Sequence, residues 1–367
     1  MPFNPLRRLR GVKYTAIDFG HHSLKAVRCQ AKKDDIKALD CGQVILPQGS
    51  IVNGRINDIS HVSRQLNQLI NSLEGNTGQV IFAPAVGQEF VRKISIPSMP
   101  EDELEEALRW EVEEYLNLPP EQVASDFLIL EEGEEELEVL LVVLPLNILD
   151  GYKEVFNRLN INPRVANAQE LSLISLLTLQ NKLAEPAAII NIGAEKTRIT
   201  IASQNEFFLS RTVEQGGNNF TKIFKEEDNS WEEAENNKIE SEIPLQQEEE
   251  EALDIDLMIS GMAGSQRASS KLREEAGRLA EEISRSLEYY QDRHSGERLT
   301  NVFVTGGGLR LTNLQQFLEQ EVGYSLNKVK PFHNIRCENS SALEPGEENV
   351  INVALGLVAS EVIYDAH

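Results

Sequence analysis

The strongest constraint on the fold is a pattern of strand, glycine turn and strand that occurs twice in the chain. Residues 12–29 are apolar and β-prone on both sides of a turn at Gly20. Residues 187–202 have the same character on both sides of a turn at Gly193. The copies are too different for a tandem array, so we interpret them as a distant internal duplication. The chain is therefore predicted to be of the α/β class, with two similar halves.

A third glycine segment follows a third apolar strand. Residues 301–304 are predicted to form a buried strand, and Gly306, Gly307 and Gly308 follow it, opening a helix. Between the two hairpins, residues 84–166 alternate strand and helix patterns as a β-α-β-β-α-β unit. This unit is predicted to interrupt the first half as an inserted subdomain.

The first helix of the insert has two chemically different faces. Residues 101–116 place apolar side chains on one stripe and glutamates on the other, which is typical of a helix that covers a core. Trp110, within this helix, and Trp231 are predicted to be packing residues rather than a platform for stacking bases.

The net charge of −24 comes from two segments. Residues 98–136 hold fifteen acidic residues and one basic residue. Residues 225–256 hold fourteen acidic and two basic residues, and the stretch 242–265 is predicted to be an acidic loop flanking a short helix. This charge argues against non-specific nucleic-acid binding, which needs a cationic surface. We interpret the acidic segments as solvated helix faces and a charged loop, with a docking surface for a basic partner as the alternative.

The cysteines and the apolar runs indicate the cellular compartment. Cys29, Cys41 and Cys337 show neither metal-site nor disulfide spacing, so they are predicted to be free thiols in a reducing compartment. The longest apolar run, residues 139–146, is far shorter than the roughly 20 residues of a membrane span. Residues 1–10 are basic but lack the apolar stretch of a secretory signal. We therefore expect a soluble, cytoplasmic protein.

The three glycine turns are predicted to bind phosphate, because glycine permits positive φ and lets several backbone N–H groups approach one anion. Asp18, at the end of the first strand, could hold a Mg²⁺-bound water. Ser23 and Lys25 on the returning strand could add a hydroxyl group and a cation. The turn at 193–196 would supply a second backbone cradle, and residues 306–308 would let a nucleoside lie against the backbone near a helix N-terminus.

Five segments in the chain carry a resemblance to a known family: residues 18–25, 94–111, 191–197, 231–238 and 304–311. In that order, they resemble five parts of the FtsA branch of the actin-like ATPases: the first phosphate loop, the inserted subdomain, the second phosphate loop, the adenosine-side helix and the adenosine loop. The sequence is most similar to the PilM proteins of type IV pilus assembly, over nearly the whole chain. The resemblance implies an actin-like (RNase H-like) two-lobed α/β fold with an FtsA-type inserted subdomain.

The same resemblance implies a division into four subdomains. They are subdomain 1A from residues 12–83, 167–186 and 340–363, the inserted subdomain 1C from 84–166, subdomain 2A from 187–219 and 301–339, and subdomain 2B from 220–300. In this family a groove between 1A and 1C binds the partner.

The resemblance further implies ATP or ADP with Mg²⁺ as cofactors, bound where the phosphate loops converge on one cavity. The implied nucleotide-binding residues are Asp18, Gly20, Ser23, Lys25, Asn191, Gly193, Ala194, Thr197, Gly216, Gly217, Glu235, Lys238, Gly306, Gly307 and Gly308, with Asp18 holding Mg²⁺ through a water.

Two positions depart from the family pattern. Asn191 stands where the second loop usually begins with Asp, and His21 stands where Ser or Thr usually follows the first glycine. Nucleotide binding can survive both changes, because backbone N–H groups make most of the contacts with the phosphates. No residue is evident that would activate water, so the catalytic residues stay unassigned and at most slow ATPase activity is expected.

PilM-like proteins lie under the inner membrane and bind the short cytoplasmic N-terminal tail of a membrane protein, PilN. The resemblance therefore implies a PilN-like partner and a peripheral position at the inner membrane through that partner alone. A tail with a basic residue would suit the acidic insert. Other proteins of the pilus platform, its motor proteins and self-association are left open, and no nucleic-acid partner is expected.

Three alternatives remain. Asn191 and His21 motivate a scaffold that no longer binds nucleotide. A component of a type II secretion system or of a mannose-sensitive (MSHA-type) pilus would carry similar motifs. A sugar or acyl kinase shares the superfold, although residues 167–170 lack a clear kinase-type Asp motif.

Overall fold

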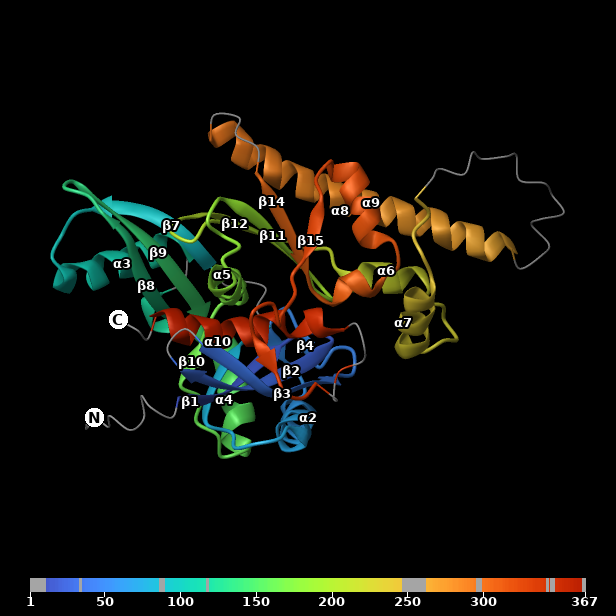
Figure 1. Cartoon of the computed structure of the whole chain (residues 1–367), viewed down its shortest axis with the longest axis horizontal. Helices are drawn as coiled ribbons and strands as arrows, with labels where there is room; N and C mark the ends of the chain where they lie inside the picture. The colour runs from blue at the N-terminus through green and yellow to red at the C-terminus, as the bar shows by residue number, and fades with distance from the viewer. Residues whose placement is uncertain are drawn as a thin grey trace. The chain divides into compact units, whose positions relative to one another are not determined.

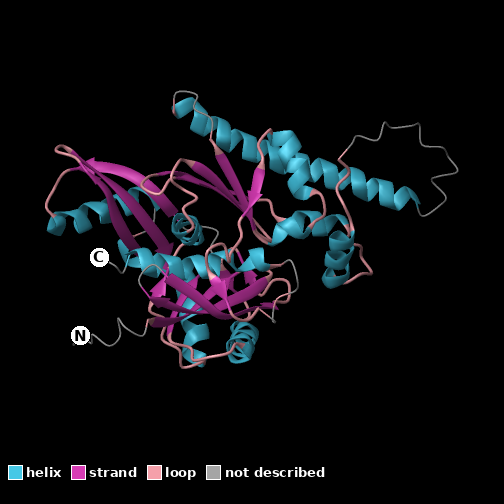
Figure 2. Cartoon of the chain, in the orientation of Figure 1, coloured by secondary structure: helices cyan, strands magenta, loops and turns pink. Residues whose placement is uncertain are grey.

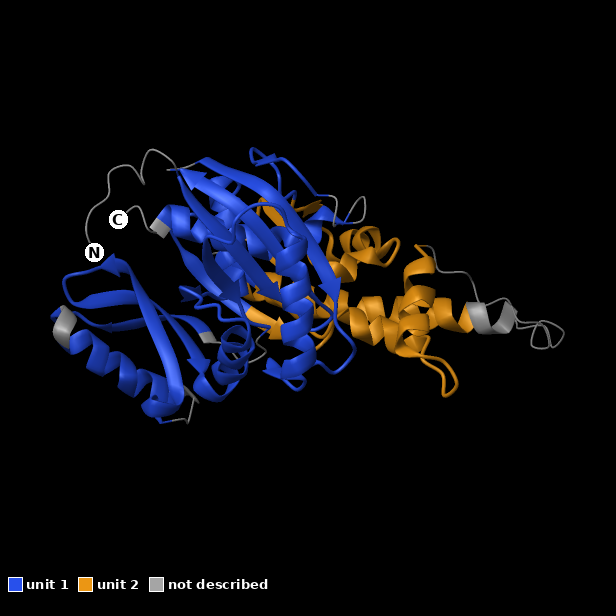
Figure 3. Cartoon of the chain, turned by 90° about the horizontal axis from the view of Figure 1, so that it is seen from below, with its two compact units in different colours: residues 1–186, 200–210, 330–367 blue, residues 187–199, 211–329 orange. Residues whose placement is uncertain are grey.

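The computed structural model describes residues 11–32, 35–85, 90–116, 119–245, 262–294, 299–340, 343 and 347–364. The chain forms two compact units, which Figure 3 colours separately. Unit 1 comprises residues 1–186, 200–210 and 330–367, and unit 2 comprises residues 187–199 and 211–329. Of the predicted acidic loop, residues 246–261 lie outside the described residues.

Unit 1 is built on a six-stranded sheet with the order β10-β6-β1-β2-β3-β16. Strands β1, β2 and β3 are antiparallel neighbours, while β6 and β10 run parallel to β1 on one side and β16 runs parallel to β3 on the other. The bounds are β1 Val12–Phe19, β2 Ser23–Lys32, β3 Asp35–Ile45, β6 Gln79–Ala83, β10 Val165–Ala166 and β16 Arg336–Cys337. The predicted first hairpin is therefore the centre of this sheet.

Helices cover both faces of this sheet (Figures 1 and 2). On one face, α2 (Ile59–Ser72) and α4 (Leu146–Arg158) bury their apolar residues against β1 and β2. On the other face, α10 (Asn352–Tyr364) packs on β1, β2, β6 and helix α5 (Gln169–Leu179). Helix α4 lies within the range 84–166, yet it belongs to the core of the first sheet.

The start and end of helix α2 have identifiable side-chain partners. Asp58 accepts a hydrogen bond from the backbone N–H of His61, which caps the first turn. The buried guanidinium of Arg28, on β2, donates to the carbonyl oxygens of Ile70 at 2.8 Å and Leu73 at 2.5 Å. These carbonyls have no partner within the helix, so Arg28 satisfies the C-terminal end of α2.

The remainder of the insert is a three-stranded antiparallel sheet with the order β7-β9-β8, covered by α3. The bounds are β7 Phe90–Pro97, α3 Glu101–Leu116, β8 Val123–Glu132 and β9 Glu136–Pro145. Leu104, Leu108 and Val112 of α3 are buried against this sheet, as the predicted stripe required. Trp110, in contrast, has 67% of its surface exposed, so the prediction that it packs in a core is wrong.

The smaller elements of unit 1 are the hairpin strands β4 Ile51–Val52 and β5 Arg55–Ile56 and the 3₁₀ turns η1 Pro120–Gln122 and η3 Glu348–Ile351.

While residues 200–210, which include the end of the second hairpin, belong to unit 1, unit 2 contains the second glycine turn and the third glycine segment. Its strands belong to a sheet with the order β13-β12-β11-β14-β15, in which β11, β14 and β15 are parallel neighbours. The strands are β11 Ala187–Ile192, β12 Thr197–Ala202, β13 Phe207–Val213, β14 Asn301–Thr305 and β15 Leu326–Lys328. The helices are α6 Gly217–Ile223, α7 Trp231–Glu240, α8 Met262–Arg293 and α9 Leu314–Val322, with the 3₁₀ turn η2 Gly307–Arg310.

All three cysteines are free, as predicted, and Cys29 and Cys41 are buried. Burial raises the pKa of both thiols above the ordinary value of 9.0, and burial also raises the pKa of Cys337. The folded state therefore keeps thiol protons that the unfolded state loses above about pH 9. The contribution of these thiols to stability is complete below that pH and is lost as pH rises further.

We expect Cys29 and Cys41 to resist a thiol reagent at pH 8 in the native protein, while all three cysteines react in urea. The urea concentration at the unfolding midpoint should decrease when the pH is raised from 8 to 10. The decrease should be smaller in a Cys29→Ala variant. Rapid native labelling of Cys29 at pH 8 would contradict this account.

Candidate nucleotide-binding site

The first predicted phosphate loop joins β1 and β2 in unit 1. The strands are paired up to the turn, with Asp18 opposite Lys25, and the N–H of Gly20 donates to the carbonyl of Ser23 at 3.0 Å. Asp18 is 4% exposed, and its Oδ2 lies 3.2 Å from the Lys25 Nζ. The hairpin thus brings Asp18, Gly20, Ser23 and Lys25 together at one end of the sheet.

Gln169, which the sequence analysis did not single out, completes this group. It is the first residue of α5, and its Nε2 donates to Asp18 Oδ1 at 3.0 Å and to the carbonyl of Phe19 at 3.4 Å. Its contact with Asp18 spans 151 residues of chain, so local spacing gives no signal for it. The only hint is its position in the first turn of a helix that follows a strand.

The second predicted loop, in unit 2, is held by backbone hydrogen bonds to the start of α6. The N–H of Gly217 donates to the carbonyl of Gly193 at 2.9 Å, and the N–H of Asn218 donates to the carbonyl of Ala194 at 2.7 Å. Thr197 is fully buried, and its hydroxyl donates to the carbonyl of Gln215 at 2.7 Å. Thr197 therefore fixes the loop to the segment before α6.

Gly216 lies where a side chain has no room. A Cβ atom there would lie 2.7 Å from the carbonyl oxygens of both Gly193 and Ala194. At Gly217 a Cβ would lie 3.6 Å from the Lys238 Nζ and 3.7 Å from the Gly308 Cα. The second loop, the start of α6, α7 and the third glycine segment are thus packed against one another within unit 2.

The third segment follows β14 and has the backbone conformation that its glycines allow. Gly306 has φ +101°, the sole positive φ among the predicted loop residues Gly20, Gly193 and Gly306. A Cβ on Gly306 would lie 2.6 Å from the Asn191 Oδ1, so Asn191 packs directly against this turn. The segment opens the short 3₁₀ turn η2 rather than an α-helix, which corrects the expected helix N-terminus at this position.

The predicted pair on the adenosine side forms a buried ion pair on α7. The Lys238 Nζ lies 2.6 Å from the Glu235 Oε1, and the Thr221 hydroxyl donates to Glu235 Oε2 at 2.6 Å. Lys238 is 4% exposed, and burial lowers its pKa although the Glu235 carboxylate opposes that effect. The pair is oriented by α6 and α7 together, because Thr221 lies on α6.

Within each unit, then, the structure assembles the residues that the sequence assigned to that unit. Unit 1 brings together Asp18, Gly20, Ser23 and Lys25, and unit 2 brings together Asn191, Gly193, Ala194, Thr197, Gly216, Gly217, Glu235, Lys238 and residues 306–308.

A family model described as "Type IV pilus assembly protein PilM" matches residues 16–254. The chain belongs to the PilM family. This match confirms the family resemblance, and the matched range includes the first two predicted phosphate loops and the entire insert.

Solved structures agree with the family on the fold. The PilM–PilN type IV pilus biogenesis complex has a chain 20% identical to this one, with a TM-score of 0.78 over 96% of this chain and 99% of that chain. The ethanolamine utilization protein EutJ from Carboxydothermus hydrogenoformans is 12% identical, with a TM-score of 0.54 over 98% of this chain and 91% of that chain. MreB5 of Spiroplasma citri bound to AMPPNP is 13% identical, with a TM-score of 0.52 over 97% of each chain. The predicted actin-like α/β fold is therefore confirmed.

Across the part of the chain that the structure describes, no helix combines the length and the apolar character needed to cross a membrane.

Proposed function

We propose that this member of the PilM family binds ATP and serves as a nucleotide-binding component of the type IV pilus assembly platform. The observation that supports this most is the packing within unit 2, where Gly193, Gly216, Gly217 and Gly308 meet without side chains. The N–H groups of Gly193, Gly216 and Gly217 already donate to oxygen atoms within the unit, so these glycines would act by letting a phosphate or a nucleoside approach the backbone closely. The buried Lys238–Glu235 pair beside them supplies polar groups for a ribose or base.

The hairpin of unit 1 has groups of its own that suit a phosphate and a metal ion. Asp18 is a buried carboxylate at the carboxyl end of β1, next to the parallel strand β6, and its oxygen atoms suit Mg²⁺ or a water bound to Mg²⁺. Lys25 would then exchange its ion pair with Asp18 for one with a phosphate. Gln169 would hold the Asp18 carboxylate in position.

Any hydrolysis is expected to be slow. Asn191 offers an amide instead of a carboxylate beside the third glycine segment, and it adds no charge toward a metal ion.

Isothermal titration with ATP and MgCl₂ tests the proposal directly. We expect saturable binding that weakens when EDTA replaces Mg²⁺, and little phosphate release. Absence of binding under both conditions would favour the alternative, a scaffold that uses the fold without a nucleotide. Phosphorylation of a small sugar or acyl substrate would favour the kinase alternative.

We further propose that a cavity in unit 1 binds the cytoplasmic N-terminal tail of a PilN-like membrane protein. The cavity has about 130 Å³ and is lined by β8, β9, helix α4 and the segments at the ends of β6 and β10. Its residues are Pro84, Ala124, Ser125, Asp126, Val142, Val143, Leu144, Leu149, Ala166, Asn167 and Ala168. It is mainly apolar, it lies beside the edge strand β8, and Asp126 is its acidic group. An extended tail with apolar side chains and a basic residue fits this chemistry. The protein would then reach the inner membrane through its partner.

Reversing the charge at Asp126 should weaken tail binding about tenfold, because a basic residue of the tail would meet a lysine. The measurement is fluorescence anisotropy with the labelled N-terminal peptide of the neighbouring membrane protein. Glu131→Lys, an identical charge change at an exposed residue of the same edge strand outside the cavity, is the matched control. Equal loss in both variants would indicate a general charge effect and count against this cavity. In Ala166→Trp, the larger side chain of an exposed lining residue should fill the cavity and prevent tail binding. Unchanged binding of the tail to this variant would also count against this cavity.

A further inference from the structure

The outward side of helix α3 carries a large aromatic residue, Trp110, that does not pack in a hydrophobic core. The inward side is complete, since Leu104, Leu108 and Val112 are buried in the core of the three-stranded sheet. Trp110 faces the other way and is 67% exposed, the largest exposed fraction among the exposed large apolar residues of the described chain. Exposing a tryptophan to water is unfavourable, and such residues are enriched at interfaces.

Carboxylates surround Trp110 at helical spacing. Glu106 precedes it by four residues, and Glu113 and Glu114 follow by three and four, so all three lie on its side of the helix. All three are exposed, and none forms an ion pair within the described part of the chain. We call these four residues the Trp110 face.

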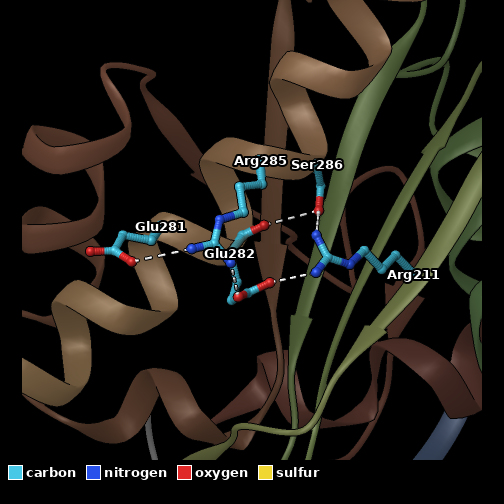
Figure 4. Close-up of polar contacts among 5 residues, drawn as sticks. All are labelled: Arg211, Glu281, Glu282, Arg285 and Ser286. Carbon is cyan, nitrogen blue, oxygen red and sulfur yellow. Dashed lines mark hydrogen bonds and ion pairs between the residues drawn. The ribbon is translucent and has the colours of Figure 1, made fainter.

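Helix α8, which carries as many basic as acidic residues, is a useful comparison because several of its carboxylates have partners within the chain. On α8, Glu282 accepts from Arg211 and from Arg285, and Arg285 also contacts Glu281 (Figure 4). The exposed ring of Tyr289 is covered by the guanidinium of Arg293, with 4.7 Å from the Arg293 Cζ to the ring centroid. On α8 the chain's own arginines thus pair with Glu281 and Glu282 and cover the ring of Tyr289.

We propose that the Trp110 face is a docking surface for a partner segment rich in lysine and arginine. Charge complementarity selects this occupant: guanidinium groups would stack on the Trp110 ring and pair with the three carboxylates, as the chain's own arginines do on α8. None of the four residues lines the cavity beside β8, so this surface is separate from the tail-binding site proposed above.

The probe is a labelled twelve-residue peptide of alternating Arg, Lys and Ser, titrated into the full-length protein at physiological salt. We expect Trp110→Ala to weaken binding at least fivefold and the triple variant Glu106→Gln, Glu113→Gln, Glu114→Gln to weaken it at least tenfold. A triple variant on α8, Glu274→Gln, Glu281→Gln, Glu288→Gln, changes net charge equally and should stay within twofold of the parent. Equal affinity of the parent and Trp110→Ala, or an equal loss in the α8 variant, would overturn the proposal.

Three further measurements test whether the peptide binds on the Trp110 face itself. In a Trp231→Phe background, the peptide should change the fluorescence of Trp110, and an unchanged spectrum at saturation would contradict stacking. The same peptide with citrulline in place of arginine should bind at least fivefold more weakly. Asp126→Lys should leave peptide affinity unchanged. If it abolished binding while Trp110→Ala did not, the peptide would occupy the tail-binding cavity and the proposal would be wrong.

Discussion

A Gly216→Ala substitution is expected to weaken ATP binding at least tenfold. The added methyl group would lie 2.7 Å from two backbone oxygens, those of Gly193 and Ala194, and backbone atoms cannot move aside as a flexible side chain can. The substitution must therefore separate the second phosphate loop from the start of α6. Because Gly216 has φ −154°, which any residue adopts, the effect comes from this contact and not from backbone strain. Titration calorimetry with ATP and MgCl₂ gives the affinity.

The matched control is Gly277→Ala on helix α8, where an added Cβ meets no atom within 4 Å. Alanine is a better helix former than glycine, so this variant should be more stable by about 0.5–1 kcal/mol and bind ATP normally. If Gly216→Ala bound ATP as tightly as Gly277→Ala, the packed glycines of unit 2 would not be the binding surface.

The second large effect concerns the ion pair on α7. Replacing Lys238 by methionine should destabilise unit 2 by about 3–5 kcal/mol, because it leaves the Glu235 carboxylate, whose side chain is 12% exposed, without its cation. Thr221 would still donate to that carboxylate, but one neutral hydrogen bond does not replace a charge. Urea unfolding followed by circular dichroism measures the loss.

The double variant Lys238→Met, Glu235→Gln tests the cause. It removes both charges and should recover more than half of the lost stability, as double-mutant cycles show for directly coupled groups. If the double variant were as unstable as Lys238→Met alone, lost packing of the lysine side chain would explain the result instead. ATP affinity of the folded double variant then reports whether the charges themselves contact the nucleotide.

The parts of the fold that depend on local pattern could be predicted from the sequence. The hairpin around Gly20 and the stripe containing Leu104 and Leu108 follow from alternation and helical spacing. The lack of a side chain permits the positive φ of Gly306 without requiring it, since Gly20 and Gly193 do not have a positive φ. The buried Lys238–Glu235 contact was also within reach, because the two residues lie three positions apart on one helix.

The parts that depend on distant partners could not be predicted. Gln169 reaches Asp18 across 151 residues, and Arg28 reaches the end of α2 across 45 residues. Trp110 was predicted to be buried because it is a large aromatic residue, but it is exposed. The inward side of α3 was already filled by aliphatic residues, so the tryptophan was left outside.

The composition of unit 1 has a consequence for its biosynthesis. Its sheet is made almost entirely from the first third of the chain, but α10, which covers one face, and β16, which pairs with β3, come after residue 330. A growing polypeptide leaves the ribosome with its N-terminal part first. The apolar face under α10 therefore stays uncovered while unit 2 is being translated, and exposed apolar surface of this kind favours aggregation during that interval.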